Sequence, residues 1–124
     1  MKLLLVTDAT WVHNDVAASI PPGWTMQVTD SRVAVAAAAQ HQPNVVLIDL
    51  QVGSMGGFAI VRALKDAVSL GDLVPTKMVL LLDRSADRFL VKRSGADGAL
   101  LKPFTSQELR GVLTEVITEP PVRT

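Results

Sequence analysis

Short apolar runs alternate along this chain with longer stretches in which apolar residues recur with a helical period. Uninterrupted runs of three to five apolar residues are typical of strands that are buried on both faces of a sheet. The segment from Trp24 to Thr29 instead alternates apolar and polar side chains, which predicts a strand nearer the edge of the sheet. The five expected strands cover residues 3–6, 24–29, 45–48, 78–82 and 99–101.

The stretches between these runs predict amphipathic helices. Val12, Val16 and Ile20 recur every four residues, so they lie on one face of a helix. Thr105 and Glu108 form a capping-box pattern at the start of the last helix. The segments with helical character cover residues 10–20, 34–39, 61–68, 86–90 and 105–117.

The strict alternation of five strands with five helices predicts an α/β fold. Such a (βα)5 chain forms a parallel sheet that is covered by helices on both faces. Ligands of these sheets bind at the carboxyl ends of the strands, where the strand order reverses. The polar residues that end the strands are therefore expected to meet in one pocket, and these residues are Thr7, Asp8, Asp49, Asp83 and Lys102.

Composition restricts the classes of function. The 124 residues suffice for one domain, expected at 1–119 with a tail at 120–124. The chain has no cysteine, which excludes disulfides, thiolate metal sites and a cysteine nucleophile. Lysine plus arginine and aspartate plus glutamate each number 12, which argues against nucleic acid as a partner. No apolar stretch approaches the roughly 20 residues of a membrane span, so we expect a soluble, cytoplasmic protein.

The residues at the strand ends lie in motifs that resemble a response-regulator receiver domain. Each motif is short, but their order and spacing around the five-fold alternation make the set specific. The resemblance covers about residues 2–117 and implies a flavodoxin-like, doubly wound sheet of order 2-1-3-4-5. The motifs are Val6-Thr-Asp8, Leu47-Ile-Asp-Leu50 with Met55-Gly-Gly57 after it, Gly95-Ala-Asp-Gly98 and Lys102-Pro-Phe104.

The resemblance assigns a role to individual residues. Asp49 matches the aspartate that accepts a phosphoryl group from a histidine kinase, and Lys102 matches the lysine that pairs with the phosphoryl oxygens. Asp8, Asp49 and the backbone carbonyl of Gln51 match the protein ligands of a magnesium ion. Pro103 matches a proline that usually follows a cis peptide bond. Phosphoryl transfer needs such a carboxylate, a hard cation and a positive charge.

The chain also departs from the family pattern at four positions. Thr7 replaces the first of two acids, and Asp83 replaces the threonine or serine that bonds the phosphoryl group. Ala99 replaces the aromatic residue that moves with the switch, and Gly53 replaces a proline. We therefore expect weak magnesium binding and a weak conformational switch. Two roles remain open for Asp83: it lies in the pocket, or it caps the next helix.

The leading hypothesis is a stand-alone response regulator that is not an enzyme and acts through protein contacts. Its partners would be a sensor histidine kinase or phosphotransfer protein, and an effector or a second copy. The main alternative is a phosphorylation-independent pseudo-receiver. A flavodoxin-like FMN binder and a small hydrolase are less favoured alternatives. Trp11 and Trp24 are interpreted as packing residues. The expected output face, on the fourth helix, fifth strand and fifth helix, includes Arg88, Val91, Lys92, Leu109 and Val112.

Overall fold

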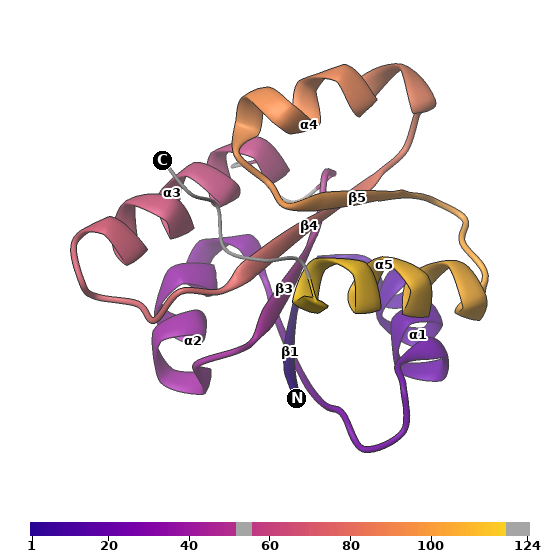
Figure 1. Ribbon diagram of the computed structural model, residues 1–124, viewed down its shortest axis with the longest axis horizontal. Coiled ribbons are helices and arrows are strands. Elements are labelled where there is room, and N and C mark those ends of the chain that lie inside the picture. The colour runs from indigo at the N-terminus through magenta and orange to yellow at the C-terminus, as the bar shows by residue number, and fades with distance from the viewer. Residues whose placement is uncertain (52–55, 119–124) are drawn as a thin grey trace.

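Five parallel strands form one sheet in the order β2-β1-β3-β4-β5 in the computed structural model, which describes residues 1–51 and 56–118 (Figure 1). This confirms the predicted α/β fold and the strand order. The second strand begins one residue later than expected, because the Trp24 amide donates to the Pro21 carbonyl in a turn. The strands are β1 (Lys2–Val6), β2 (Thr25–Thr29), β3 (Val45–Asp49), β4 (Lys77–Leu82) and β5 (Gly98–Leu101).

Helices cover both faces of the sheet, as the sequence predicts. Two of them, α1 and α5, pack side by side on one face, and the other three cover the opposite face (Figure 1). Short 3-10 turns precede the second and fourth helices, at Ser31–Val33 and Ser85–Asp87. The helices are α1 (Thr10–Ser19), α2 (Ala34–His41), α3 (Gly57–Ser69), α4 (Arg88–Ser94) and α5 (Ser106–Thr118).

The uninterrupted apolar strands follow from this two-sided burial. Along β3, Val45 and Leu47 pack toward α1 and α5, while Val46 and Ile48 pack toward α2 and α3. All four side chains are fully buried, because successive residues of a strand face opposite sides of the sheet. The polar residue that ends the strand, Asp49, lies at the carboxyl edge and is itself buried, so it needs polar partners there.

Polar side chains cap the 3-10 turn that precedes α2 and the start of α5. The Asp30 carboxylate accepts hydrogen bonds from the amides of Arg32 and Val33, and the hydrogen bond from the Arg32 side chain lowers the pKa of Asp30. The predicted capping box is confirmed, since the Glu108 amide donates to the Thr105 hydroxyl and the Thr105 amide donates to the Glu108 carboxylate.

Gly57 allows α3 to begin directly against the end of β3. A methyl group at this position would lie 2.8 Å from the Leu50 Cα and 3.1 Å from the Asp49 carbonyl oxygen. We expect Gly57→Ala to lower the free energy of unfolding by about 1–3 kcal/mol, because backbone atoms cannot move aside as a flexible side chain can. Urea denaturation would measure the change.

Gly111→Ala is the matched control for this substitution. Gly111 lies within α5, and a methyl group there would meet no atom within 4 Å. It should raise stability by up to about 1 kcal/mol, since alanine is the better helix former. A Gly57→Ala protein as stable as the unmodified chain would contradict the close contact between α3 and β3.

Two sequence-based expectations concern residues 52–55 and 119–124. The departure at Gly53 and the domain boundary at 119, with its tail, lie outside the described residues. Among the helices of residues 1–51 and 56–118, none is both long enough and apolar enough to cross a membrane.

Candidate functional site

Asp49 ends β3 at the carboxyl edge of the sheet, and both oxygens of its carboxylate accept hydrogen bonds. Oδ1 accepts from the Lys102 ammonium at 2.5 Å and from the Gln51 amide at 3.3 Å. Oδ2 accepts from the Thr7 hydroxyl at 2.9 Å. The residue is only 1% exposed, and burying a carboxylate costs free energy unless it has such partners.

Lys102 brings the positive charge of the site from the end of β5. Its backbone amide donates to the Leu82 carbonyl at 2.8 Å, which holds the residue beside the end of β4. The peptide bond from Lys102 to Pro103 is cis, as the family resemblance implies. The side chain is 5% exposed, so the ammonium lies in the pocket rather than in solvent.

Asp83 lies at the rim of the same pocket. Its Oδ1 is 3.0 Å from the Lys102 ammonium, and its side chain is 36% exposed. No side chain caps the 3-10 turn that follows it. The alternative that the sequence left open is therefore resolved, because Asp83 faces Lys102 and does not act as a helix cap. One ammonium lies between two carboxylates, which leaves one negative charge in excess.

Thr7 and Asp8 follow β1 and differ in their surroundings. The Thr7 hydroxyl is buried, donates to Asp49 and accepts from the Ala9 amide at 3.1 Å. Asp8 is exposed, and the residue at the start of α1 is Ala9, without a side-chain cap. Asp49, Lys102, Asp83 and Thr7 thus form one connected cluster, and Asp8 lies at the same end of β1 facing solvent.

The site supplies oxygen donors of the kind that magnesium prefers. Two carboxylates, from Asp8 and Asp49, and the carbonyl of Gln51 come from adjoining strand ends. Within residues 1–51 and 56–118, no three acidic or histidine side chains already surround a point where a metal could lie. The donor chemistry fits magnesium, but Asp49 is already hydrogen-bonded on both oxygens, which favours weak binding.

Trp11 is a pocket residue that the sequence interpretation missed. Its ring lies on the first turn of α1, and the Lys102 ammonium lies 5.6 Å from the ring centroid, within the range of a cation–π contact. The residue is 50% exposed, so the interpretation as a packing residue is wrong for Trp11. Trp24 does pack against the core beside α1 and α5. The position of Trp11 three residues after Asp8 could have indicated a place beside the site.

Comparison with known proteins places the chain in one family. The family model described as the response regulator receiver domain matches residues 22–114. The chain belongs to the receiver domain family. Receiver domains are signalling modules rather than classical enzymes, and they generally bind Mg²⁺ for phosphorylation. They interact with histidine kinases or phosphotransfer proteins and with effectors.

Individual receiver proteins resemble this chain at modest identity. Protein PilH of Pseudomonas aeruginosa is 34% identical over 84 residues, which are 67% of this chain and 68% of PilH. The transcriptional regulatory protein TrcR of Mycobacterium tuberculosis is 29% identical over 119 residues, 91% of this chain and 45% of TrcR. Response regulator PleD of Caulobacter vibrioides is 35% identical over 75 residues, 60% of this chain and 16% of PleD. The receiver therefore spans less than half of TrcR and PleD.

Solved structures agree with the fold. The chemotaxis response regulator CheY4 of Vibrio cholerae superposes with a TM-score of 0.80 at 26% identity, over 93% of this receiver and 97% of CheY4. The signal receiver domain of NarL from Mycobacterium tuberculosis superposes with a TM-score of 0.77 at 23% identity, over 95% and 97% of the two chains. The match to the receiver family model and the likeness to CheY4 favour a receiver over the FMN binder and the hydrolase that the sequence left open.

Proposed function

We propose that this receiver accepts a phosphoryl group on Asp49 from a sensor histidine kinase or phosphotransfer protein and signals through protein contacts. The observation that carries the proposal is the buried pair of Asp49 and Lys102, whose charged atoms lie 2.5 Å apart at the carboxyl edge of the sheet. A carboxylate nucleophile with a fixed ammonium beside it has the chemistry that phosphoryl transfer requires.

The hydrogen bonds indicate which oxygen reacts. Oδ1 accepts from both Lys102 and Gln51, whereas in the described part of the chain Oδ2 accepts from the Thr7 hydroxyl alone. A hydroxyl can rotate away, so Oδ2 is the freer oxygen to attack phosphorus. The new O–P bond forms as the P–N bond to the donor histidine breaks, and the released imidazole nitrogen takes up a proton. Lys102 then balances the charge of the phosphoryl oxygens.

Magnesium would be held by Asp8, Asp49 and the Gln51 carbonyl, with water completing its coordination. When bound, the ion neutralises negative charge on the phosphoryl group. Thr7 brings no charge to this set, and its hydroxyl occupies one Asp49 oxygen. Weak binding is therefore part of the proposal.

The switch positions indicate a limited conformational response. Ala99 is half-buried on β5 and carries no ring that could change its rotamer. Asp83 already contacts Lys102, so a phosphoryl group on Asp49 would share the ammonium with a second anion instead of gaining a free cation. A ligand shifts an equilibrium only by its differential affinity for the two states. We therefore propose that output relies mainly on a surface that exists before phosphorylation.

The proposed output surface is the face formed by α4, β5 and α5, for an effector or a second copy. Arg88, Val91, Lys92 and Val112 lie there and are exposed or half-buried. Leu109, which the sequence analysis placed on this face, is fully buried against the sheet, so that assignment is wrong. The apolar stripe of α5 is wide enough that its centre packs inward while its margin, at Val112, reaches the surface.

Incubation with acetyl phosphate and magnesium tests the acceptor. Intact-mass analysis should show the gain of one phosphoryl group, and no gain in Asp49→Asn or when magnesium is chelated. Asp97→Asn is unsuitable as a control because its carboxylate bonds the Met78 amide; Asp72→Asn, at an exposed loop position, is the matched control and should be modified normally. If the wild-type chain gains no phosphoryl group, the result would support the pseudo-receiver instead. If Asp49→Asn gains as much phosphoryl group as the wild type, another residue is the acceptor.

A further inference from the structure

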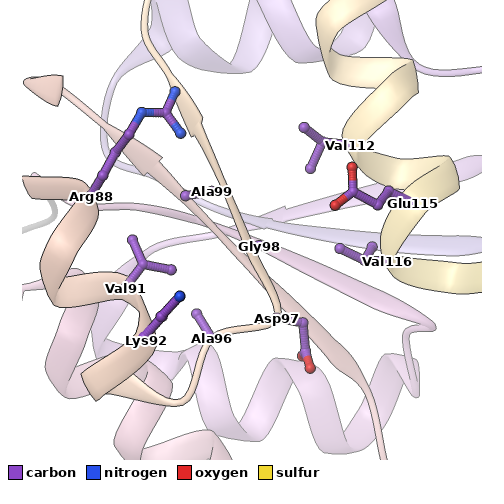
Figure 2. Close-up of a pocket in the computed structure, with 10 residues that line it drawn as sticks. All are labelled: Arg88, Val91, Lys92, Ala96, Asp97, Gly98, Ala99, Val112, Glu115 and Val116. Atoms are coloured by element: carbon purple, nitrogen blue, oxygen red, sulfur yellow. The ribbon is translucent and has the colours of Figure 1, made fainter. Parts of the chain in front are cut away.

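A groove lies over β5, between α4 on one side and α5 on the other (Figure 2). Its volume is about 390 Å³, within the range of sites that enclose ligands. Gly98 and Ala99 form its floor, where the side chains are too small to cover the strand (Figure 2). We call this the β5 groove, and it is lined by Arg88, Val91, Lys92, Ala96, Asp97, Gly98, Ala99, Val112, Glu115 and Val116.

The floor of the β5 groove is the free edge of a sheet. β5 is the last strand in the order, and in the described part of the chain it pairs with β4 alone. Alternate residues of an edge strand turn their N–H and C=O groups away from the sheet, where they are available to another strand. Gly98 and Ala99 remain partly exposed, so neither α4 nor α5 closes over this edge.

The two walls of the groove differ in charge. Arg88 and Lys92 lie on α4, are exposed, and form no ion pair among the residues described. Both side chains reach toward the groove from the α4 side (Figure 2). The opposite wall carries Val112 and Val116 with the exposed Glu115. Asp97 does not neutralise the cations, because its carboxylate accepts the Met78 amide at 2.8 Å.

We propose that the β5 groove binds an extended peptide segment of a partner protein, which adds to β5 as a sixth strand. Side chains of such a strand point alternately to the two walls. Acidic side chains would face Arg88 and Lys92, and apolar side chains would face the half-buried Val112. Glu115 would repel an acid on its own wall, so the charges also select the orientation of the strand.

This inference deepens the output contact proposed above and rests on that choice of face. In this mode of binding, most of the affinity comes from backbone hydrogen bonds between the peptide and β5. The cations of α4 add specificity, because they favour a peptide with an acidic residue at every second position. Binding in this form requires no phosphoryl group on Asp49. The peptide test below and the acetyl phosphate test can therefore fail separately.

A capped hexapeptide of alternating glutamate and valine, Glu-Val-Glu-Val-Glu-Val, is the probe. Added to the isotope-labelled protein, it should shift the amide NMR signals from Gly98 to Leu101 in a saturable manner. The same peptide with methylated backbone nitrogens on its β5-facing side should bind at least tenfold more weakly, because it cannot donate to the strand. A Lys-Val peptide of equal length should also bind at least tenfold more weakly.

Protein variants test the charged wall. Arg88→Glu combined with Lys92→Glu should weaken binding of the Glu-Val peptide at least tenfold. Arg93→Glu is the matched control, because Arg93 is exposed on the same helix but lines a different hollow with Phe58 and Leu90. Binding of that control should change less than threefold.

Several outcomes would overturn the proposal. These are the absence of shifts at β5, equal binding of the methylated peptide, and equal binding of the Lys-Val peptide. Concentration-dependent dimerisation that protects the same β5 amides without any peptide would also overturn it, since the occupant would then be a second copy of the chain.

Discussion

Lys102→Met is expected to lower the free energy of unfolding by about 3–5 kcal/mol. Asp49 is 1% exposed, and Lys102 is the only cation that contacts it among the described residues. Methionine fills a similar volume but leaves the carboxylate buried without a compensating charge. Urea denaturation monitored by circular dichroism would measure the loss. Lys92→Met, at an exposed position on α4, should change stability by less than about 0.5 kcal/mol.

The double variant Lys102→Met with Asp49→Asn separates the charge from the packing. Removing the carboxylate as well should restore at least half of the lost stability, because the remaining amide no longer carries a charge. A single Lys102→Met variant within about 1 kcal/mol of the unmodified protein would show that the pair contributes far less than a buried ion pair does. A double variant no more stable than the single one would assign the loss to packing.

Asp83→Thr is expected to accelerate phosphorylation of Asp49 by acetyl phosphate about tenfold or more. Asp83 and Asp49 both contact the Lys102 ammonium. Because both Oδ1 atoms contact the same nitrogen, at 2.5 and 3.0 Å, they lie at most about 5.5 Å apart, and two like charges at that distance repel by about 3 kcal/mol at an effective dielectric of 20. Removing even half of that repulsion from the barrier corresponds to roughly a factor of ten in rate. Threonine also adds a hydroxyl that can donate to the phosphoryl group.

Asp83→Asn isolates the contribution of charge, since it removes the carboxylate without adding a hydroxyl. It should show part of the acceleration. Asp72→Asn, the exposed-loop control, should react at the unmodified rate. Rates are compared by the time course of intact mass at one magnesium concentration. An Asp83→Thr protein that reacts no faster would mean that Asp83 does not oppose the phosphoryl group.

The positions of the site residues along the chain predicted where the pocket forms but not how its side chains are oriented. Parallel strands carry their final residues to one edge, so the meeting of Asp49, Asp83 and Lys102 follows from the strand assignments alone. The orientation of the Asp83 side chain depends on its contact with Lys102, which is distant in sequence and follows a different strand. Local propensity favours a helix cap at such a position equally well.

Helical periodicity predicted which residues share one face of a helix, but it did not predict how deeply each of them is buried. Leu109 and Val112 belong to one apolar stripe of α5, yet Leu109 is fully buried and Val112 lines the β5 groove. A stripe spans a wide arc of a helix, and only the packed structure shows which part of it meets the sheet. Trp11 was missed for the related reason that an aromatic residue in a first turn fits a core contact as readily as a pocket rim.

The contact between Trp11 and Lys102 gives the domain an optical reporter of its own. Indole emission depends on nearby charge, and here an ammonium lies 5.6 Å from the ring centroid. A phosphoryl group or a magnesium ion that redistributes charge around Lys102 alters the surroundings of this ring. Trp24, packed near the opposite edge of the sheet beside β2, supplies a constant second signal. Occupancy of the pocket can thus be followed in the unlabelled protein, with Trp24→Phe removing the background.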